Sequence, residues 1–416
     1  MNEMLQTLGE NAREAEVILR NLGTAKKNQV LEAVADSLVA HADKLLAANA
    51  IDVENGRRNH MPEGLVDRLM LTEARIEGMA EGLRQVAALE DPIGEVTGMK
   101  KRPNGLMIGQ KRVPLGVIGI IYEARPNVTS DAAALCLKSG NAVILRGGKE
   151  AFHSNQCITN IMQAALEQVG LSGNCVQLVQ NTSRESANEM MRLTEYLDVL
   201  IPRGGAGLIK AVVENAKVPV IETGSGNCHV YVDESADVAM AADIIFNAKT
   251  SRPSVCNAIE TVLVHKTIAE KALPVIEKRL KEKQVEIRGC QTVCRILPDA
   301  VPATEQDWAT EYLGYTLAIR VVDDIHQAID HIMTYTTGHS ECIVTESYTN
   351  AMLFTSQIDA AAVYVNASTR FTDGGMFGLG AEIGISTQKL HARGPMGIEQ
   401  LTSVKFIVNG NGQIRI

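Results

Sequence analysis

The sequence contains no Cys-x-x-Cys pair, although it has eight cysteines among 416 residues. The cysteines are scattered, and the pair Cys290 and Cys294 has no further ligand candidates close by in the sequence. A structural zinc site needs four ligands, and a disulfide framework is typical of short secreted chains. The pattern therefore predicts reduced thiols in a cytoplasmic protein without a metal site.

Long apolar runs and an excess of basic charge are also missing. The longest apolar runs, such as 115–122, are far shorter than the ~20 residues that a membrane-spanning helix needs. Residues 1–20 are acidic and amphipathic, and they lack the basic-then-apolar order of a signal peptide. The formal net charge is −9, whereas a nucleic-acid binder usually carries a basic surface. We therefore expect neither a membrane nor a nucleic acid as a partner.

Two well-known phosphate-binding signatures are absent as well, because the chain has neither a G-x-G-x-x-G motif nor a P-loop. The composition is 45% hydrophobic and 21% charged, which is typical of a soluble globular protein. A chain of this length is sufficient for two or three domains with a large buried core. We find no internal repeat and no low-complexity segment.

The chain is expected to open with a layer of helices. Apolar residues recur every three or four positions from Leu5 to Leu22, from Val30 to Leu46 and from Ile76 to Leu89, which is the spacing of one helix face. These helices carry apolar packing residues and no recognisable chemistry.

A basic hairpin is expected next, over Glu95 to Arg112. Asn104-Gly105 between two extended runs is a strong hairpin signal. Such an arm either binds a polyanion or packs against another subunit, and the second interpretation is favoured. The tail from Thr402 to Val408 alternates like a strand and is a candidate partner for this hairpin.

From residue 115 onward, strands alternate with helices. The expected strands are 117–122, 142–145, 175–178 and 197–201 in a first run, and 259–264, 316–322, 341–344 and 361–365 in a second. Such alternation predicts parallel sheets that helices cover on both faces. Ligands of these sheets bind beyond the carboxyl ends of the strands.

One cysteine, Cys256, lies in a loop between an expected helix, Val238 to Lys249, and the strand 259–264. Pro253 cannot continue the helix, so the chain should turn here. A loop on a rigid scaffold can expose a reactive thiol in a cleft. The competing interpretation is that Cys256 is a small hydrophobic residue of the core.

Two glycine turns follow expected strands. At Gly204 and Gly205 a strand end meets a helix start, where backbone amides either approach a phosphate or have no ligand. At the other turn, Arg146 and Lys149 flank two glycines, where they either hold a phosphate or form a solvated basic turn.

Further polar residues also follow strands. Asn127 either caps the next helix or donates to a developing oxyanion. Glu222, after an expected short strand at 218–221, is a general base, a cofactor contact or a turn residue. His229 and His339 are given no catalytic role, since a lone histidine is usually structural.

In this order, the motifs resemble those of the aldehyde dehydrogenase superfamily over nearly the whole chain. The segments that carry the resemblance are Tyr-Glu-Ala-Arg-Pro-Asn at 122–127, Ile-Glu-Thr-Gly-Ser-Gly-Asn-Cys-His at 221–229 and Pro-Ser-Val-Cys-Asn at 253–257. They are most similar to the branch that reduces acyl phosphates.

The resemblance implies an α/β fold with two doubly wound domains and a small β-hairpin oligomerisation arm. The NADP-binding domain would comprise residues 1–94 and 114–235, the catalytic domain 236–400, and the arm 95–113 and 401–416. The arm implies a homo-oligomer.

The resemblance also assigns roles by position. Cys256 matches the nucleophile, and Asn127 matches the asparagine of the oxyanion hole. Gly204 and Gly205 match the turn near the cofactor diphosphate. Glu311 resembles the glutamate that holds the nicotinamide ribose.

Four further residues are assigned in the same way. Arg146 matches the lysine of the family's K-P-A-E motif, and Lys149 falls where its glutamate would be, so NADPH is the expected cofactor. Glu222 occupies the position of the general base in hydrolytic relatives; we group it with the cofactor-binding residues, and its role stays open. Arg125 and Arg370 are candidates for binding the substrate's carboxylate.

The implied reaction is the NADPH-dependent reduction of L-glutamyl 5-phosphate to L-glutamate 5-semialdehyde and phosphate, through a thioester on Cys256. It is the second step of proline biosynthesis from glutamate, and a functional contact with the kinase that makes the acyl phosphate stays open. The alternatives are a hydrolytic aldehyde dehydrogenase and a non-catalytic nucleotide-binding protein.

Overall fold

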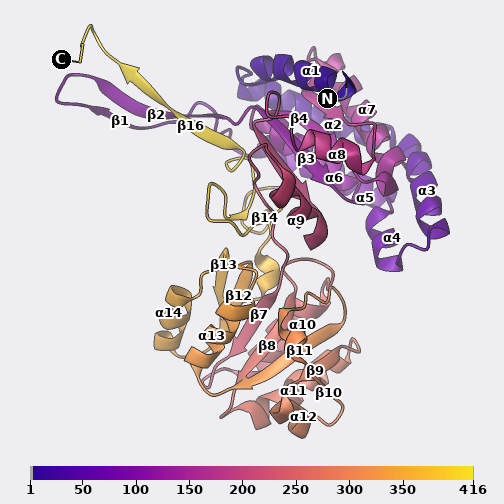
Figure 1. The fold of residues 1–416 in the computed structure, drawn as a ribbon, viewed down its shortest axis with the longest axis vertical. Coiled ribbons are helices and arrows are strands. Elements are labelled where there is room, and N and C mark those ends of the chain that lie inside the picture. Colours follow the sequence, from indigo (N-terminus) through magenta and orange to yellow (C-terminus); the bar gives the residue numbers. More distant parts are fainter. Residues whose placement is uncertain (1–2, 416) are drawn as a thin grey trace. The chain divides into compact units, whose positions relative to one another are not determined.

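The chain folds as two units in the computed structural model, which describes residues 3–415 (Figure 1). Unit 1 contains the chain up to residue 222 together with 378–384 and the C-terminal segment from 396 onward. Unit 2 contains 223–377 and 385–395.

The division differs from the boundary expected at residue 235. Strand β7 (Cys228–Val232) pairs with β8 (Ile259–His265) and β12 (Ser340–Val344), so it belongs to the sheet of unit 2. Residues 378–384 and 396–400, expected in the second domain, group with unit 1. Local sequence patterns do not reveal such a return of the chain.

The helical layer expected at the start of unit 1 is present. It consists of α1 (Glu3–Leu19), α2 (Thr24–Ala40), α3 (Ala42–Arg58), α4 (Glu63–Leu69) and α5 (Glu73–Ala88). The helix expected from Val30 to Leu46 is divided at His41, where α2 ends and α3 begins.

The sheet of unit 1 has the order β5-β4-β3-β6, and its strands are parallel. The strands are β3 (Val117–Tyr122), β4 (Ala142–Arg146), β5 (Val176–Leu178) and β6 (Val199–Arg203). Helices α6 (Asn127–Lys138), α7 (Phe152–Gln168), α8 (Arg184–Met190) and α9 (Ala206–Asn215) and the 3₁₀ turns η1 (Lys149–Ala151) and η2 (Gly173–Cys175) complete this part. Strand β3 is buried at every position, as expected for a parallel sheet covered on both faces.

One expected strand, at 218–221, is reduced to a single bridge between Leu200 and Val220. Pro219 accepts a hydrogen bond from Leu200 but has no N–H of its own to donate. A proline in this position therefore prevents a continuous ladder.

The arm of unit 1 is an antiparallel sheet of β1 (Val96–Lys101), β2 (Met107–Pro114) and β16 (Thr402–Asn409), in the order β1-β2-β16. The register pairs Thr402 with Pro114 and Asn409 with Met107. The prediction that the tail pairs with the hairpin is confirmed. Figure 1 shows this three-stranded arm extending away from the helices of unit 1.

The sheet of unit 2 has the order β10-β9-β11-β8-β7-β12-β13, and every neighbouring pair is parallel. The strands not yet defined are β9 (Glu286–Gly289), β10 (Val301–Pro302), β11 (Thr316–Val322) and β13 (Ala362–Val365). The helices are α10 (Val238–Thr250), α11 (Ala269–Lys281), α12 (Gln291–Ile296), α13 (Ile325–Tyr335) and α14 (Tyr348–Gln357). Short elements are η3 (Glu305–Ala309), η4 (Thr369–Phe371), β14 (Ile385–Ser386) and β15 (Gly394–Pro395).

Helices cover the two faces of this sheet with separate apolar cores. Buried residues of α10, α11 and α12 pack with one face, and those of α13 and α14 pack with the other. The doubly wound α/β fold is therefore confirmed, although β9, α12 and β10 were not expected. Within residues 3–415, no helix is both long and apolar enough to cross a membrane.

Candidate active site

The expected cofactor residues of unit 1 gather at one edge of its sheet. In the parallel ladder, Ile121 of β3 pairs with Arg146 of β4, and Tyr122 pairs with Arg203 of β6. The three strands therefore end together. The segments that follow them carry Asn127, Lys149 and the glycine turn at 204–205, at the edge where such sheets bind ligands.

Asn127 is the first residue of α6, and it does not cap this helix. The cap position is Pro126, and no side chain caps the helix. The side-chain amide of Asn127 instead donates to Asp131 Oδ2 at 2.8 Å, and Asn127 is exposed. Capping is therefore wrong as an interpretation of Asn127, and the carboxylate of Asp131 fixes the orientation of its amide.

The Asp131 carboxyl has an unusual environment. Burial raises its pKa to about 6, although hydrogen bonds from Asn127 and Ser130 and the charge of Arg203 act in the opposite direction. Burial disfavours the ionised form because the charge loses its water. Asp131 was not identified from the sequence.

The glycine turn at 204–205 already holds an anionic group, the side chain of Glu123. The Gly205 N–H donates to Glu123 Oε2 at 2.9 Å. A Cβ on Gly204 would lie 2.6 Å from the carboxyl carbon of Glu123, so a side chain at 204 would displace it. Glu123 follows β3 and was not assigned a role from the sequence.

Arg146 and Lys149 differ in their surroundings. The guanidinium of Arg146 donates to the carbonyls of Thr182 at 2.6 Å and Ser183 at 2.8 Å, and burial lowers its pKa. Within residues 3–415 its Nε is buried without a hydrogen-bond partner. Lys149 is exposed at the start of η1. Arg146 therefore braces the loop after β5, and Lys149 is the more accessible cation.

Two other candidate site residues of unit 1 are half-buried. Arg125 is half-buried, and its backbone N–H donates to the carbonyl of Glu123 at 2.7 Å. Glu222 is half-buried and is the last residue of the first segment of unit 1.

In unit 2, Cys256 lies in the loop between the end of α10 and the start of β8, as predicted. Cys256 is half-buried. The next residue, Asn257, holds the loop in place through hydrogen bonds of both its side chain and its backbone. The Asn257 side-chain amide donates to the carbonyl of Thr372 at 2.9 Å, and its backbone carbonyl accepts from Thr369 Oγ1 at 2.6 Å. The loop therefore holds Cys256 at the amino end of β8.

Arg370 also belongs to this support. Its Nε donates to Ser251 Oγ at 3.0 Å, and Nη1 donates to the side-chain oxygen of Asn257. The guanidinium thus links both ends of the Cys256 loop. This contact was not predicted for Arg370, which the sequence suggested only as a ligand of the substrate.

Gly226 packs directly against the Cys256 backbone. A Cβ on Gly226 would lie 1.5 Å from the carbonyl oxygen of Cys256 and 2.7 Å from its Cα. The Gly226 N–H donates to Glu311 Oε1 at 2.8 Å. Gly226 therefore lies between two predicted site residues, Cys256 and Glu311, and only glycine fits there.

A buried ion pair supports the loop that carries Glu311. Lys249 donates to Glu260 Oε2, and the side chains of both are fully buried. The other carboxyl oxygen of Glu260 accepts from the Leu313 N–H at 3.2 Å. Leu313 has a φ of 56°, a left-handed conformation that non-glycine residues seldom adopt.

Burial shifts both members of this pair toward their neutral forms. It raises the pKa of Glu260 to about 7, and it lowers the pKa of Lys249. Their mutual attraction opposes both shifts. A charged residue within the apolar run of β8 is the sequence signal that could have revealed this pair.

His229 and His339 of unit 2 are buried. His229 Nδ1 lies 3.0 Å from Glu341 Oε2. His339 Nδ1 lies 3.7 Å from Cys228 Sγ, and this thiol donates to the carbonyl of Cys256 at 3.2 Å. Burial raises the pKa of Cys228 well above its usual value, so Cys228 is a neutral support behind the Cys256 loop.

Comparisons with known proteins cover the whole chain. The sequence profile described as the aldehyde dehydrogenase family matches residues 2–291. The gamma-glutamyl phosphate reductase of Moorella thermoacetica is 62% identical over 411 residues, which are 99% of this chain and 98% of that protein. The enzyme of the same name from Enterococcus faecalis is 59% identical over 411 residues and covers 99% of each chain.

Solved structures agree with these sequences. The crystal structure of gamma-glutamyl phosphate reductase from Thermotoga maritima matches with a TM-score of 0.96 and 52% identity, over 100% of both chains. An acetylating aldehyde dehydrogenase from Geobacillus thermoglucosidasius matches with a TM-score of 0.73 at 19% identity, over 100% of this chain and 98% of that one. The second match supports the fold alone. From the profile and the identity to full-length relatives, the chain belongs to the aldehyde dehydrogenase family.

Proposed function

We propose that this chain catalyses the NADPH-dependent reduction of L-glutamyl 5-phosphate to L-glutamate 5-semialdehyde and phosphate, in proline biosynthesis. The observation that carries the proposal is a half-buried cysteine, Cys256, held at a strand end in a chain about 60% identical to gamma-glutamyl phosphate reductases over its full length.

In the proposed reaction, the Cys256 thiolate attacks the acyl carbon of the substrate, and the bond to the phosphate oxygen breaks. Phosphate leaves with the electron pair, and a thioester remains on Cys256. Asn127 is the proposed donor to the oxyanion that forms during the attack. Losing one such donor typically lowers the rate by ~10²–10³-fold.

Aldehyde dehydrogenases use nicotinamide cofactors, and such a cofactor, when bound, supplies the hydride that reduces the thioester. Glu311 is proposed to accept hydrogen bonds from the nicotinamide ribose through the carboxylate oxygen that Gly226 leaves available. Collapse of the resulting thiohemiacetal releases the aldehyde and regenerates the thiolate. Because phosphate is a good leaving group, the first step needs no strong general acid.

The turns of unit 1 fit a phosphorylated dinucleotide in part. Lys149 is an exposed cation at the carboxyl end of β4, as a 2′-phosphate requires. Arg146 retains a buried Nε without a partner among the described residues. At Gly205, however, the N–H is occupied by Glu123. We therefore propose NADPH preference through Lys149 and Arg146, with Glu123 competing with the cofactor diphosphate for Gly205.

Glu222 would have no thioester hydrolysis to promote in a reductase. Its carboxylate is proposed to contact the cofactor, and Arg125 and Arg370 are the proposed cations near the substrate's amino-acid carboxylate. For Arg370 this role would be combined with its support of the Cys256 loop.

The arm of unit 1 supports a homo-oligomer. Along β16, the alternating residues Val404, Phe406 and Val408 are 46%, 67% and 53% exposed. Alternate positions share one face of a strand, so the arm presents an apolar strip that another subunit would bury. We propose that the oligomer works in the cytoplasm, where the kinase that makes the acyl phosphate is a candidate functional partner.

The experiment that tests this function follows the reverse reaction. NADP⁺ reduction with glutamate 5-semialdehyde is measured with and without inorganic phosphate, in the wild type and in Cys256→Ser. The proposal expects reduction that requires phosphate and is lost in the variant. Reduction at an equal rate without phosphate would instead favour a hydrolytic aldehyde dehydrogenase with Glu222 as its base.

The cofactor preference has its own test. Lys149→Ala should raise the KM for NADPH by about 10- to 100-fold, since one charged contact to phosphate is worth ~1.5–3 kcal/mol, while the KM for NADH stays the same. Equal effects on both cofactors would contradict recognition of the 2′-phosphate by Lys149.

A further inference from the structure

Unit 2 has a cavity of about 350 Å³ that lies away from the Cys256 loop. It is lined by residues that follow three neighbouring strands: Lys266 after β8, Thr292 after β9, and Asp323 after β11. Cys256 precedes β8, whereas the cavity lies at the carboxyl end of this strand. The seven residues of β8, at ~3.3 Å each, separate the two places by roughly 20 Å.

The cavity lies at a topological switch point of the sheet. Strand β11 lies between β9 and β8. The helices that follow β8 and β9, α11 and α12, pack on one face, and α13, which follows β11, packs on the other. In open α/β sheets, a crevice opens where consecutive helices go to opposite faces, and ligands bind there beyond the strand ends.

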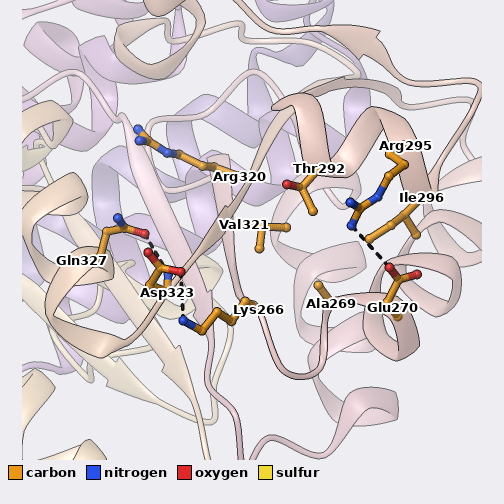
Figure 2. A pocket seen from close by; sticks show the side chains of 10 residues that line it. All are labelled: Lys266, Ala269, Glu270, Thr292, Arg295, Ile296, Arg320, Val321, Asp323 and Gln327. Carbon is orange, nitrogen blue, oxygen red and sulfur yellow. Dashed lines mark hydrogen bonds and ion pairs between the residues drawn. The ribbon is translucent and has the colours of Figure 1, made fainter.

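Charges line the cavity in two opposed pairs (Figure 2). Lys266 Nζ lies 3.0 Å from Asp323 Oδ1, and Arg295 Nη2 lies 3.5 Å from Glu270 Oε1. Figure 2 shows the pairs on either side of the cavity, with the Thr292 hydroxyl between them. Arg320 points away from both pairs, and its guanidinium donates to His331 Nδ1 at 3.2 Å.

The ion pairs are exposed, with side-chain exposures of 56% and 64% for Lys266 and Asp323, and 71% and 75% for Arg295 and Glu270. Exposed ion pairs contribute little to stability, so a ligand can exchange their partners at small cost. A simple anion would meet two carboxylates here, and a simple cation would meet two basic groups. A small zwitterion can satisfy both signs at once.

We propose that this cavity is a second ligand site, distinct from the Cys256 loop, which binds a small zwitterionic amino acid. The carboxylate of the ligand pairs with Arg295 or Lys266, and its ammonium group pairs with Asp323 or Glu270. A volume of about 350 Å³ lies at the lower end of the range for small-molecule sites. Because the site is separate from Cys256, its ligand would not compete with the acyl phosphate of the proposed reaction.

The test is calorimetric titration of the whole chain with glycine, L-proline, L-glutamate and L-lysine, and with acetate and ethylammonium as ligands of a single charge. The expected result is saturable binding of at least one amino acid and none of acetate or ethylammonium. The double variant Glu270→Gln with Arg295→Gln should weaken this binding by about tenfold or more, because hydrogen bonds to charged groups are lost.

The matched control is Arg279→Gln with Glu282→Gln. Arg279 lies on α11 and Glu282 directly follows it; their contact is 2.6 Å, their side chains are 38% and 51% exposed, and neither residue lines the cavity. Binding should be unchanged in the control. Thr292→Trp gives a second variant, which fills the cavity while leaving both ion pairs in place, and circular dichroism melting verifies that each variant is folded.

The proposal is overturned if none of the four amino acids binds, or if acetate or ethylammonium binds equally well. It is also overturned if a bound amino acid retains its affinity in the Glu270 and Arg295 variant or in Thr292→Trp. In that case the amino acid is bound elsewhere on the chain.

Discussion

Replacing Gly226 with alanine would change the support of the Cys256 loop directly. The new Cβ would lie 1.5 Å from the Cys256 carbonyl oxygen and 2.3 Å from its carbonyl carbon, whereas real Cβ contacts are essentially never under 3.0 Å. The atoms involved are backbone atoms, so no flexible side chain can move aside. The two segments must therefore separate by about 1.5 Å, which would displace Cys256, Glu311 or both.

The expected effect of Gly226→Ala is large for both activity and stability. A misplacement of ~1 Å at a reacting group can cost ~10²-fold in rate, so kcat should fall by at least about this factor. Overpacking a close backbone contact typically costs ~1–3 kcal/mol of stability. Steady-state kinetics of phosphate-dependent NADP⁺ reduction and urea unfolding measure the two effects.

Gly78→Ala is the control for this variant. Gly78 lies within α5, and a Cβ there would meet nothing within 4 Å. Alanine in a helix is more favourable than glycine by up to ~1 kcal/mol, so the control should keep its kcat and unfold at the same or a higher urea concentration. A Gly226→Ala variant with the kcat of the wild type would show that the close contact between Gly226 and Cys256 does not position the loop.

Three further predictions concern ionisable groups. Asp131→Asn should lower kcat by roughly tenfold or more, because Asn127 loses its anionic acceptor. The substitution should also abolish a decline of kcat below about pH 6, where the Asp131 carboxyl of the wild type takes up a proton. An unchanged pH–rate profile would contradict this role of Asp131. Glu123→Gln should lower the KM for NADPH, because the group on the Gly205 N–H loses its charge, and a higher KM in initial-rate measurements would refute competition. Lys249→Met removes the charge that lowers the pKa of Glu260. The pKa of Glu260 in the folded state, about 7, lies above the ordinary value of 4.5. Between pH 4.5 and pH 7 the folded state therefore binds a proton that the unfolded state has released, and the stability of the protein falls as pH rises through this window. Relative to the wild type, Lys249→Met should therefore lose ~3–5 kcal/mol of stability at pH 8 and less than this at pH 5. Urea unfolding at the two pH values measures both losses.

The architecture was largely predictable from the sequence. Apolar runs predicted most strands of both sheets because a central parallel strand is buried on both faces, as every position of β3 and β8 is. The pairing of β16 with the hairpin was also predicted, from the alternation of its residues and from the Asn104-Gly105 turn. Strands β9 and β10 escaped detection because they are short and contain exposed or half-exposed residues, so neither forms a continuous apolar run; β10 is the edge strand and β9 lies next to it.

The candidate site was predictable by residue type and much less by contact. Cys256 was placed correctly in a loop because Pro253 and the flanking elements constrain the local backbone. The contacts behind it depend on residues far apart in the sequence, such as Glu260 with Leu313 and Gly226 with Glu311. Local patterns contain no information about which charged side chains meet once the sheet has formed.

The central claim, that the reaction passes through a thioester on Cys256, has a direct test in the stopped flow. Enzyme is mixed with NADP⁺ and glutamate 5-semialdehyde without phosphate, and absorbance reports the NADPH formed in the first turnover. A thioester on Cys256 predicts a burst of one equivalent of NADPH per chain, a slow phase that added phosphate accelerates, and no burst in Cys256→Ser. A burst that persists in Cys256→Ser, or steady turnover at the same rate with and without phosphate, would contradict it.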